Sequence, residues 1–110
     1  MDTKPLTATL SVAAQITPQD LKALREAGFR SVICNRPDGE GADQASFDEI
    51  ARAAHEQGLH CHYLPAESGK VTDAQAADFG ALMAALPKPV LAYCRTGMRS
   101  TTMWALSQAG

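Results

Sequence analysis

The sequence predicts one α/β domain, with a mainly parallel sheet of four or five strands and helices on both faces. The chain has 110 residues and is 45% apolar, which suits one domain with one hydrophobic core. Short β-prone runs alternate with helical patterns, and we find no internal repeat or low-complexity tract. Strands that alternate with helices favour parallel pairing, because each helix carries the chain back to the start of the next strand.

The first strand is expected over residues 7–12, which are β-prone. A helix follows, with Thr17 suited to its N-cap, Pro18 to its first position and Gly28 to its end. Residues 31–35 centre on the apolar run Val32-Ile33-Cys34, so they predict a buried second strand.

The next helix has a recognisable start. Ser46 and Glu49 have the spacing of a capping box, and the helix they open is expected to continue to about Gln57 and stop at Gly58. Residues 59–64 predict the third strand.

A second capping-box pattern, Thr72 with Gln75, predicts the third helix. Residues 90–93 are apolar and predict the fourth strand. A last helix is expected from about Arg99.

Three polar loops follow the second, third and fourth predicted strands, at residues 35–43, 65–71 and 94–100. Parallel sheets bind ligands beyond the carboxyl ends of their strands, so these loops predict the position of a site.

The last of these loops predicts a reactive thiolate. Cys94 lies between a buried strand and a helix, where a helix N-terminus and free backbone N–H groups favour an anion. Arg95 and Arg99 add positive charge, which lowers a thiol pKa. Gly97 permits a tight turn, and Ser100 is placed either to donate to the sulfur or to cap the helix. The loop sequence is Cys94-Arg95-Thr96-Gly97-Met98-Arg99-Ser100.

Net charge, the N-terminal sequence and the cysteine count limit the classes of function that the sequence supports. The formal net charge of −2 gives no broad electrostatic case for nucleic acid or an anionic membrane as partner. The N-terminus does not resemble a signal peptide, and three irregularly spaced cysteines favour a reducing compartment, so we expect a cytoplasmic protein. We expect no cofactor, and the sequence does not indicate an oligomeric state.

Two segments resemble the phosphatase-like domain of beta-lactamase hydrolase-like proteins: Ile33-Cys34-Asn35-Arg36-Pro37-Asp38-Gly39-Glu40 and Ala92-Tyr93-Cys94-Arg95-Thr96-Gly97-Met98-Arg99-Ser100. A third similar segment, residues 11–28, extends the resemblance over nearly the whole chain. It implies one domain over residues 1–110 with a tyrosine-phosphatase-like fold. The family's domain usually continues past the last helix, so Gly110 is expected to be an early end.

The resemblance also implies roles. Cys94 is the nucleophile, Arg99 the phosphate clamp, and residues 95–98 the cradle whose N–H groups bind the phosphate oxygens, so a phosphate monoester is the expected substrate.

Two departures from common tyrosine phosphatases leave alternatives open. Only four residues separate Cys94 from Arg99, one fewer than usual, and Tyr93 stands where a histidine is common. The shorter loop is similar to rhodanese-type sulfurtransferases, which carry a persulfide on the cysteine and act on sulfur-containing anions. A non-catalytic anion-binding module is a third hypothesis.

A phosphatase of this fold also needs a proton donor for the leaving oxygen. Glu67, in the loop at residues 65–71, is the preferred candidate. Asp73, Asp38 and Glu40 are further options, and any of these carboxylates is alternatively a solvated loop side chain.

Asn35 and Arg36 end the second predicted strand beside the site. We expect them to bind substrate or to brace the Cys94 loop, or Arg36 to form an ion pair with Asp38 or Glu40.

Three further features have simpler interpretations. His60 and His62 would share a face of one strand, but without a clear third ligand we expect no metal site. Cys34 is expected in the core. Trp104 is interpreted as the buried face of the last helix, or else as an exposed patch or dimer contact.

Overall fold

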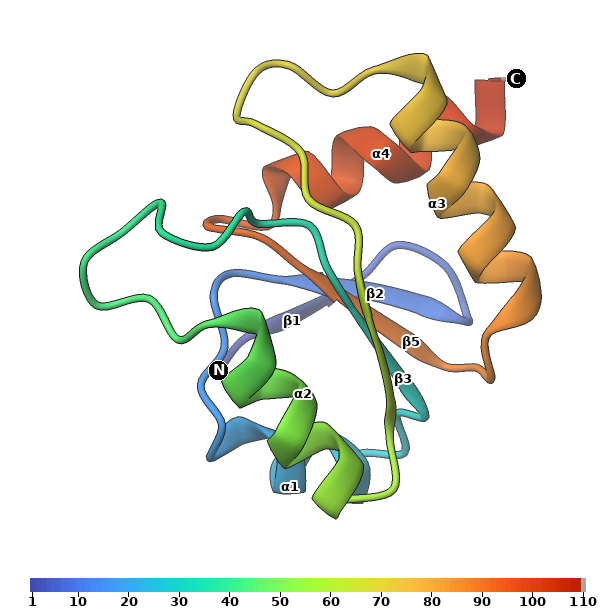
Figure 1. Cartoon of the computed structure of the whole chain (residues 1–110). Coiled ribbons are helices and arrows are strands. Elements are labelled where there is room, and N and C mark those ends of the chain that lie inside the picture. Colours follow the sequence, from blue (N-terminus) through green and yellow to red (C-terminus); the bar gives the residue numbers. More distant parts are fainter. Residues whose placement is uncertain (110) are drawn as a thin grey trace.

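A computed structural model of the chain describes residues 1–109 and confirms the predicted class, a single α/β domain (Figure 1). The strands are β1 Thr3–Pro5, β2 Leu10–Ala13, β3 Ser31–Cys34, β4 His60–Tyr63 and β5 Val90–Tyr93. The helices are α1 Asp20–Glu26, α2 Phe47–Glu56, α3 Asp73–Ala85 and α4 Met98–Ala109.

The sheet has the strand order β1-β2-β5-β3-β4, with β5 at its centre. Strands β2, β5, β3 and β4 are parallel, and only β1 runs antiparallel, against β2. Ala13 and Cys34 both pair with Tyr93 in register, so these three strands end at the same edge. The residue after Tyr93 is Cys94, which therefore leaves the sheet at the middle of that edge.

The N-terminal part of the sheet differs from the prediction. The first predicted strand starts at Leu10 rather than at residue 7, because the Thr7 hydroxyl accepts the N–H groups of Thr9 (3.1 Å) and Leu10 (3.0 Å) and closes a turn. Strand β1 was not predicted, since its three residues are all exposed and carry no alternation of apolar and polar side chains.

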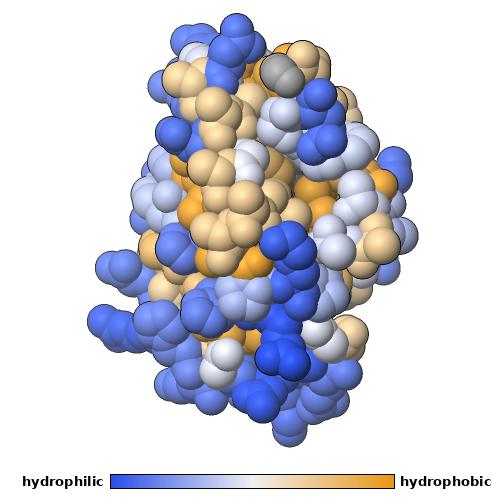
Figure 2. Space-filling model, turned by 90° about the vertical axis from the view of Figure 1, so that its right-hand side faces the viewer, coloured by the Kyte–Doolittle hydropathy of each residue, from blue (hydrophilic) through white to orange (hydrophobic). Residues whose placement is uncertain are grey.

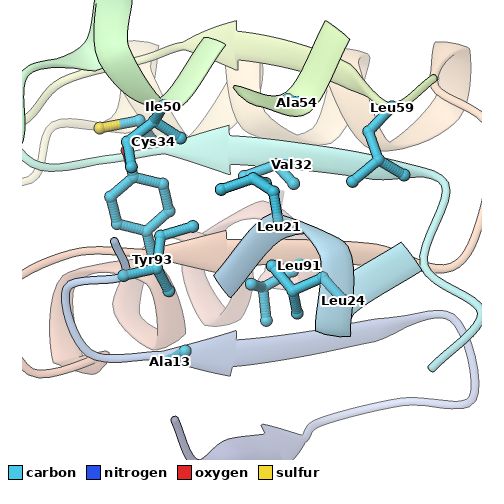
Figure 3. Close-up of a cluster of buried hydrophobic side chains, with 11 residues drawn as sticks. Ala13, Leu21, Leu24, Val32, Cys34, Ile50, Ala54, Leu59, Leu91 and Tyr93 are labelled. Atoms are coloured by element: carbon cyan, nitrogen blue, oxygen red, sulfur yellow. The ribbon is translucent and has the colours of Figure 1, made fainter. Parts of the chain in front are cut away.

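Helices α1 and α2 cover one face of the sheet, and α3 and α4 cover the other (Figure 1). The first core contains side chains from α1 and α2 against β3 and β5 (Figure 3). The second contains Phe79 of α3 and Met103 of α4 against β2, β3 and β5. All four residues of β5 are buried, with Leu91 and Tyr93 in the first core and the other two in the second, so the strand that carries Cys94 is held from both faces.

Both predicted capping boxes are present, at Ser46 and Thr72. The glycine stops are confirmed as well, with φ of 99° at Gly28 and 74° at Gly58. The start of α1 was predicted wrongly. The helix begins at Asp20, whose carboxylate accepts the Thr17 N–H at 2.9 Å, so the intervening residues form a turn.

Replacing Ser46 with alanine tests the first capping box. Its hydroxyl accepts the Glu49 N–H at 3.2 Å, and the Glu49 carboxylate accepts the Ser46 N–H in return. We expect Ser46→Ala to lower the free energy of unfolding by about 1 kcal/mol in a denaturant titration. Ser46→Asp, which preserves an acceptor, is the control, and equal stability of the alanine variant and the wild type would contradict the assignment.

Helix α3 is apolar around most of its circumference. It buries Ala76 and Phe79, yet Ala74, Ala77 and Ala81 are exposed. Figure 2 shows the resulting apolar band on the face where α3 lies, at the other end of the sheet from the Cys94 loop.

Within residues 1–109, no helix is both long and apolar enough to cross a bilayer.

Candidate active site

Cys94 begins a tight loop that is anchored to β2. The Cys94 N–H donates to the Ala13 carbonyl at 3.3 Å, and the Gln15 N–H donates to the Arg95 carbonyl at 3.4 Å. Gly97 has a φ of 93°, which favours glycine, and a Cβ there would lie 3.5 Å from the carbonyl of Ala13. The loop is therefore fixed at both its start and its turn.

The backbone of this loop converges on the Cys94 sulfur. The Gly97 N–H donates to Sγ at 3.0 Å. Cys94 is fully buried, and this burial, the largest single influence, would raise the pKa of its thiol. The N–H groups of Ser100, Thr96, Arg99 and Gly97 oppose it, and together they lower the pKa below its ordinary value. This environment favours the thiolate, as the sequence predicted.

The other two thiols lie in the opposite kind of environment. Burial raises the pKa of Cys34, and burial together with the proximity of Cys34 raises the pKa of Cys61 to about 12. Cys34 lies in the first core beside the ring of Tyr93, as predicted (Figure 3). Burial also raises the pKa of Tyr93, so its phenol stays neutral.

Arg99 is buried beside the sulfur and held by two partners. Its Nη1 and Nη2 donate to the two carboxylate oxygens of Glu40, at 2.6 and 2.8 Å, and Nη1 also donates to the Ala66 carbonyl at 3.0 Å. A guanidinium has five N–H donors, so these bonds leave Nε–H and one Nη2 hydrogen along one edge. Glu40 raises the pKa of Arg99 most, and Cys94, which is within hydrogen-bonding reach, raises it further. The free edge can therefore bind an anion at the sulfur.

Glu40 joins two buried arginines. Besides Arg99 it binds Nε of Arg36 at 2.9 Å, which is one of the two ion pairs considered for Arg36. Hydrogen bonds from Arg99, and then from Arg36, lower the pKa of Glu40 from 4.5 to about 2. Both carboxylate oxygens accept hydrogen bonds from arginines, so Glu40 is better suited to holding Arg99 than to donating a proton. Sequence reasoning did not predict its contact with Arg99, which spans 59 residues of chain.

Asn35 connects the loops of the site through buried hydrogen bonds. Its Oδ1 accepts the Ser100 hydroxyl at 2.8 Å, and its Nδ2 donates to the Leu64 carbonyl at 2.9 Å. Its own carbonyl accepts the Ala66 N–H at 3.0 Å. Asn35 and Ser100 are both fully buried, so the structure places Asn35 in a bracing position. The Ser100 hydroxyl points to Asn35, and it is the Ser100 N–H that supports the sulfur.

The remaining carboxylates differ in their surroundings. Glu67 is exposed, forms an ion pair with Lys70 at 3.3 Å and follows Ala66, whose carbonyl binds Arg99. Asp38 accepts the Phe47 N–H at 2.8 Å, and Asp73 lies in the first turn of α3. Asp38 and Glu67 both lie on loops that contact Arg99, through Glu40 and through Ala66, but Asp38 is held by the backbone at the start of α2 whereas Glu67 pairs with an exposed lysine.

The histidines and Trp104 lie elsewhere. His60 and His62 are exposed on the edge strand β4. Across the described part of the chain, no three His, Cys, Asp or Glu side chains are grouped so that they could hold a metal ion. Trp104 is half-buried and packs against the second core.

We expect Glu40→Gln to hold Arg99 less firmly and to destabilise the fold, because a neutral amide replaces a charged carboxylate as the partner of two arginines. The stability difference between the wild type and the variant should depend on pH. The folded-state pKa of Glu40 lies below its ordinary value, so its ion pairs stabilise fully above pH 4.5 and the benefit is lost as the pH falls towards 2. Thermal unfolding between these pH values measures it, and a difference independent of pH would contradict this account.

A mainly parallel sheet with helices on both faces, in this strand order, is a fold that the chain shares with tyrosine-phosphatase-like structures. Solved structures agree with this class. The domain matches TpbA of Pseudomonas aeruginosa, solved in complex with phosphotyrosine, with a TM-score of 0.70 at 18% identity over 94% of this chain and 59% of that one. This similarity concerns the fold.

The chain belongs to the family of phosphatase-like domains of beta-lactamase hydrolase-like proteins, whose model matches residues 2–110. A candidate phosphatase from Neisseria meningitidis has a TM-score of 0.90 and 31% identity, over 96% of this chain and 75% of that one. The beta-lactamase hydrolase-like protein of Agrobacterium fabrum is 33% identical over 100 residues. That alignment covers 91% of this chain but only 23% of the relative, so the chain spans about a quarter of the longer protein.

Proposed function

We propose that this domain hydrolyses phosphate monoesters through a phosphocysteine on Cys94. The observation that carries the proposal is the convergence of four backbone N–H groups on a sulfur whose pKa is lowered, next to the free edge of Arg99. Membership of a phosphatase-like family and the similarity to the neisserial candidate phosphatase support the same reaction class.

In the proposed reaction the Cys94 thiolate attacks phosphorus and the ester oxygen leaves. The N–H groups that converge on the sulfur and the Nε–Nη2 edge of Arg99 bind the non-bridging oxygens, where negative charge is carried in the transition state. Glu40 keeps the Arg99 edge turned towards these oxygens. Water then attacks phosphorus, which releases inorganic phosphate and restores the thiolate.

Glu67 is the proposed proton donor to the leaving oxygen. Its loop is tied to Arg99 through the Ala66 carbonyl, so the carboxyl needs only a change of side-chain conformation to leave Lys70 and face the substrate. We expect Glu67→Gln to lower kcat roughly 100-fold for an alkyl phosphate and much less for 4-nitrophenyl phosphate, whose leaving group needs no proton.

The matched control for Glu67→Gln is Asp73→Asn, an exposed carboxylate just beyond the same loop. Steady-state rates with both substrates are the measurement. An equal loss with both substrates, or a larger loss in Asp73→Asn, would show that Glu67 is not the donor.

The proposed reaction itself is tested with pure, reduced protein and an aryl phosphate. We expect turnover that inorganic vanadate inhibits, since vanadate adopts the geometry of the transition state and fits the same N–H groups. Turnover at background level in such a sample would overturn the proposal.

A sulfurtransferase is the second candidate, and the loop length favours it. Only four residues separate Cys94 from Arg99, and the Gly97 N–H lies at 3.0 Å from the sulfur, so the cradle is small enough to suit one outer sulfur atom. Incubation with thiosulfate would then transfer its outer sulfur to Cys94 and release sulfite, and the added sulfur would be measured as intact mass. An unchanged mass, with phosphatase activity present, would remove this candidate.

A further inference from the structure

A pocket of about 350 Å³ lies against the outer side of the Cys94 loop. Its walls come from β1, from the end of β2, from the loop and from the first turns of α4; Val12, Ala13, Thr96, Gly97, Met98 and Thr102 are among them. This volume is at the lower end of the range for small-molecule sites. The proposed reaction does not use it.

Only the loop backbone separates this pocket from the cradle. Gly97 belongs to both, because its N–H donates to the Cys94 sulfur while the residue also lines the pocket beside Ala13. Thr96 and Met98, on either side of Gly97, are exposed and form the rim between the two spaces. A ligand bound in the cradle therefore reaches the pocket by crossing a single rim.

Met98 marks this rim as a contact surface. With 71% of its surface accessible it is the most exposed large apolar side chain of the described residues. Removal of an exposed apolar side chain from water makes the free energy of ligand binding more favourable. Methionine also adapts its shape to an irregular partner, because it is unbranched and polarisable.

We propose that this pocket binds the organic group of the substrate and that it selects uncharged, largely apolar groups of about the size of a ring or a short alkyl chain. Val12, Ala13 and Met98 supply apolar contacts, and the hydroxyls of Thr96 and Thr102 tolerate an occasional polar atom. Lys4 and Asp2, both from the N-terminal segment, bring opposite charges to the same pocket, so it offers no net attraction to a second anionic group. This inference rests on the proposed function, because it assumes that the anionic end of the ligand occupies the cradle.

Binding of two alkylphosphonates tests the proposal without turnover, because their carbon–phosphorus bond is not an ester bond. Calorimetric titration compares methylphosphonate, which fills only the cradle, with hexylphosphonate, whose chain is long enough to cross the rim. Each buried methylene strengthens binding about fourfold, so burial of about two or three methylenes of the hexyl chain should make hexylphosphonate bind about 10- to 100-fold more tightly. Equal affinities would overturn the pocket assignment and leave the cradle intact, whereas binding of neither phosphonate would overturn the proposed function and the pocket with it.

A matched pair of variants tests whether this pocket is the source of the higher affinity for hexylphosphonate. Thr102→Trp fills the pocket, while Ala105→Trp places the same ring on an exposed position of α4 that does not line it. In Thr102→Trp we expect the chain-length gain to fall to within about twofold, well below the effect of one buried methylene. Methylphosphonate affinity should stay unchanged, which shows that the fold and the cradle are intact. Ala105→Trp should keep the full gain. A full gain in Thr102→Trp, or its loss in Ala105→Trp, would contradict the proposal.

Discussion

Cys94→Ser is expected to lower the rate of aryl phosphate hydrolysis by at least about 10³-fold, because a serine hydroxyl in this loop stays protonated where the thiol ionises. The loop itself should persist, since the N–H groups that converge on the sulfur belong to the backbone. The variant should therefore still bind phosphate while it fails to turn over. Steady-state kinetics and calorimetric binding of inorganic phosphate measure the two properties separately.

Cys61→Ser is the control for this substitution. Cys61 is half-buried in β4, and the pKa of its thiol is raised to about 12, so its loss should leave turnover close to that of the wild type. Full activity in Cys94→Ser would contradict the nucleophile assignment. Loss of both turnover and phosphate binding would instead show that the substitution has damaged the cradle.

Arg99→Lys is expected to lower kcat by about 10²- to 10³-fold, the loss typical of a removed oxyanion donor. A lysine keeps the positive charge but not the planar fork, so it cannot bind Glu40 with two parallel bonds and still present a second edge to the substrate. The fall should appear mainly in kcat, because the lost contacts strengthen in the transition state.

Arg52→Lys, at an exposed position of α2, is the matched control and should have wild-type kinetics. Equal activity of Arg99→Lys and the wild type would show that positive charge alone is sufficient at this position, and that the two-sided binding of the guanidinium does not matter for the reaction.

The local signals in the sequence predicted most of the fold. Capping boxes at Ser46 and Thr72 and glycines at Gly28 and Gly58 act through neighbouring residues, and the structure confirms all four. The errors occurred where a short-range hydrogen bond competed with a regular element, as the hydroxyl of Thr7 does at the start of β2. Strand β1 could not be predicted, because its position depends on pairing with β2 and not on its own pattern.

The same difference between local signals and long-range contacts applies to the candidate site. Cys94, Gly97 and Arg99 lie within one loop, so the lowered pKa of the thiol, the tight turn and the nearness of the guanidinium could be predicted from residue types and spacing. The contacts of Glu40 with Arg99, and of Asn35 with Ser100, span 59 and 65 residues of chain. They depend on how two loops meet at the edge of the sheet, which no local pattern encodes. The pairing of Arg36 with Glu40 was one of several options that the sequence left open, and the two residues lie four positions apart in one loop.

The most direct test of this account is the titration of the Cys94 thiolate by its ultraviolet absorbance, taken as the difference between the wild type and Cys94→Ser. Cys34 and Cys61 are present in both proteins, so the difference reports Cys94 alone. We expect a midpoint below the ordinary cysteine value of 9.0. A midpoint at or above 9.0 would mean that burial outweighs the backbone N–H groups, and would contradict the claim that this loop is built around a thiolate.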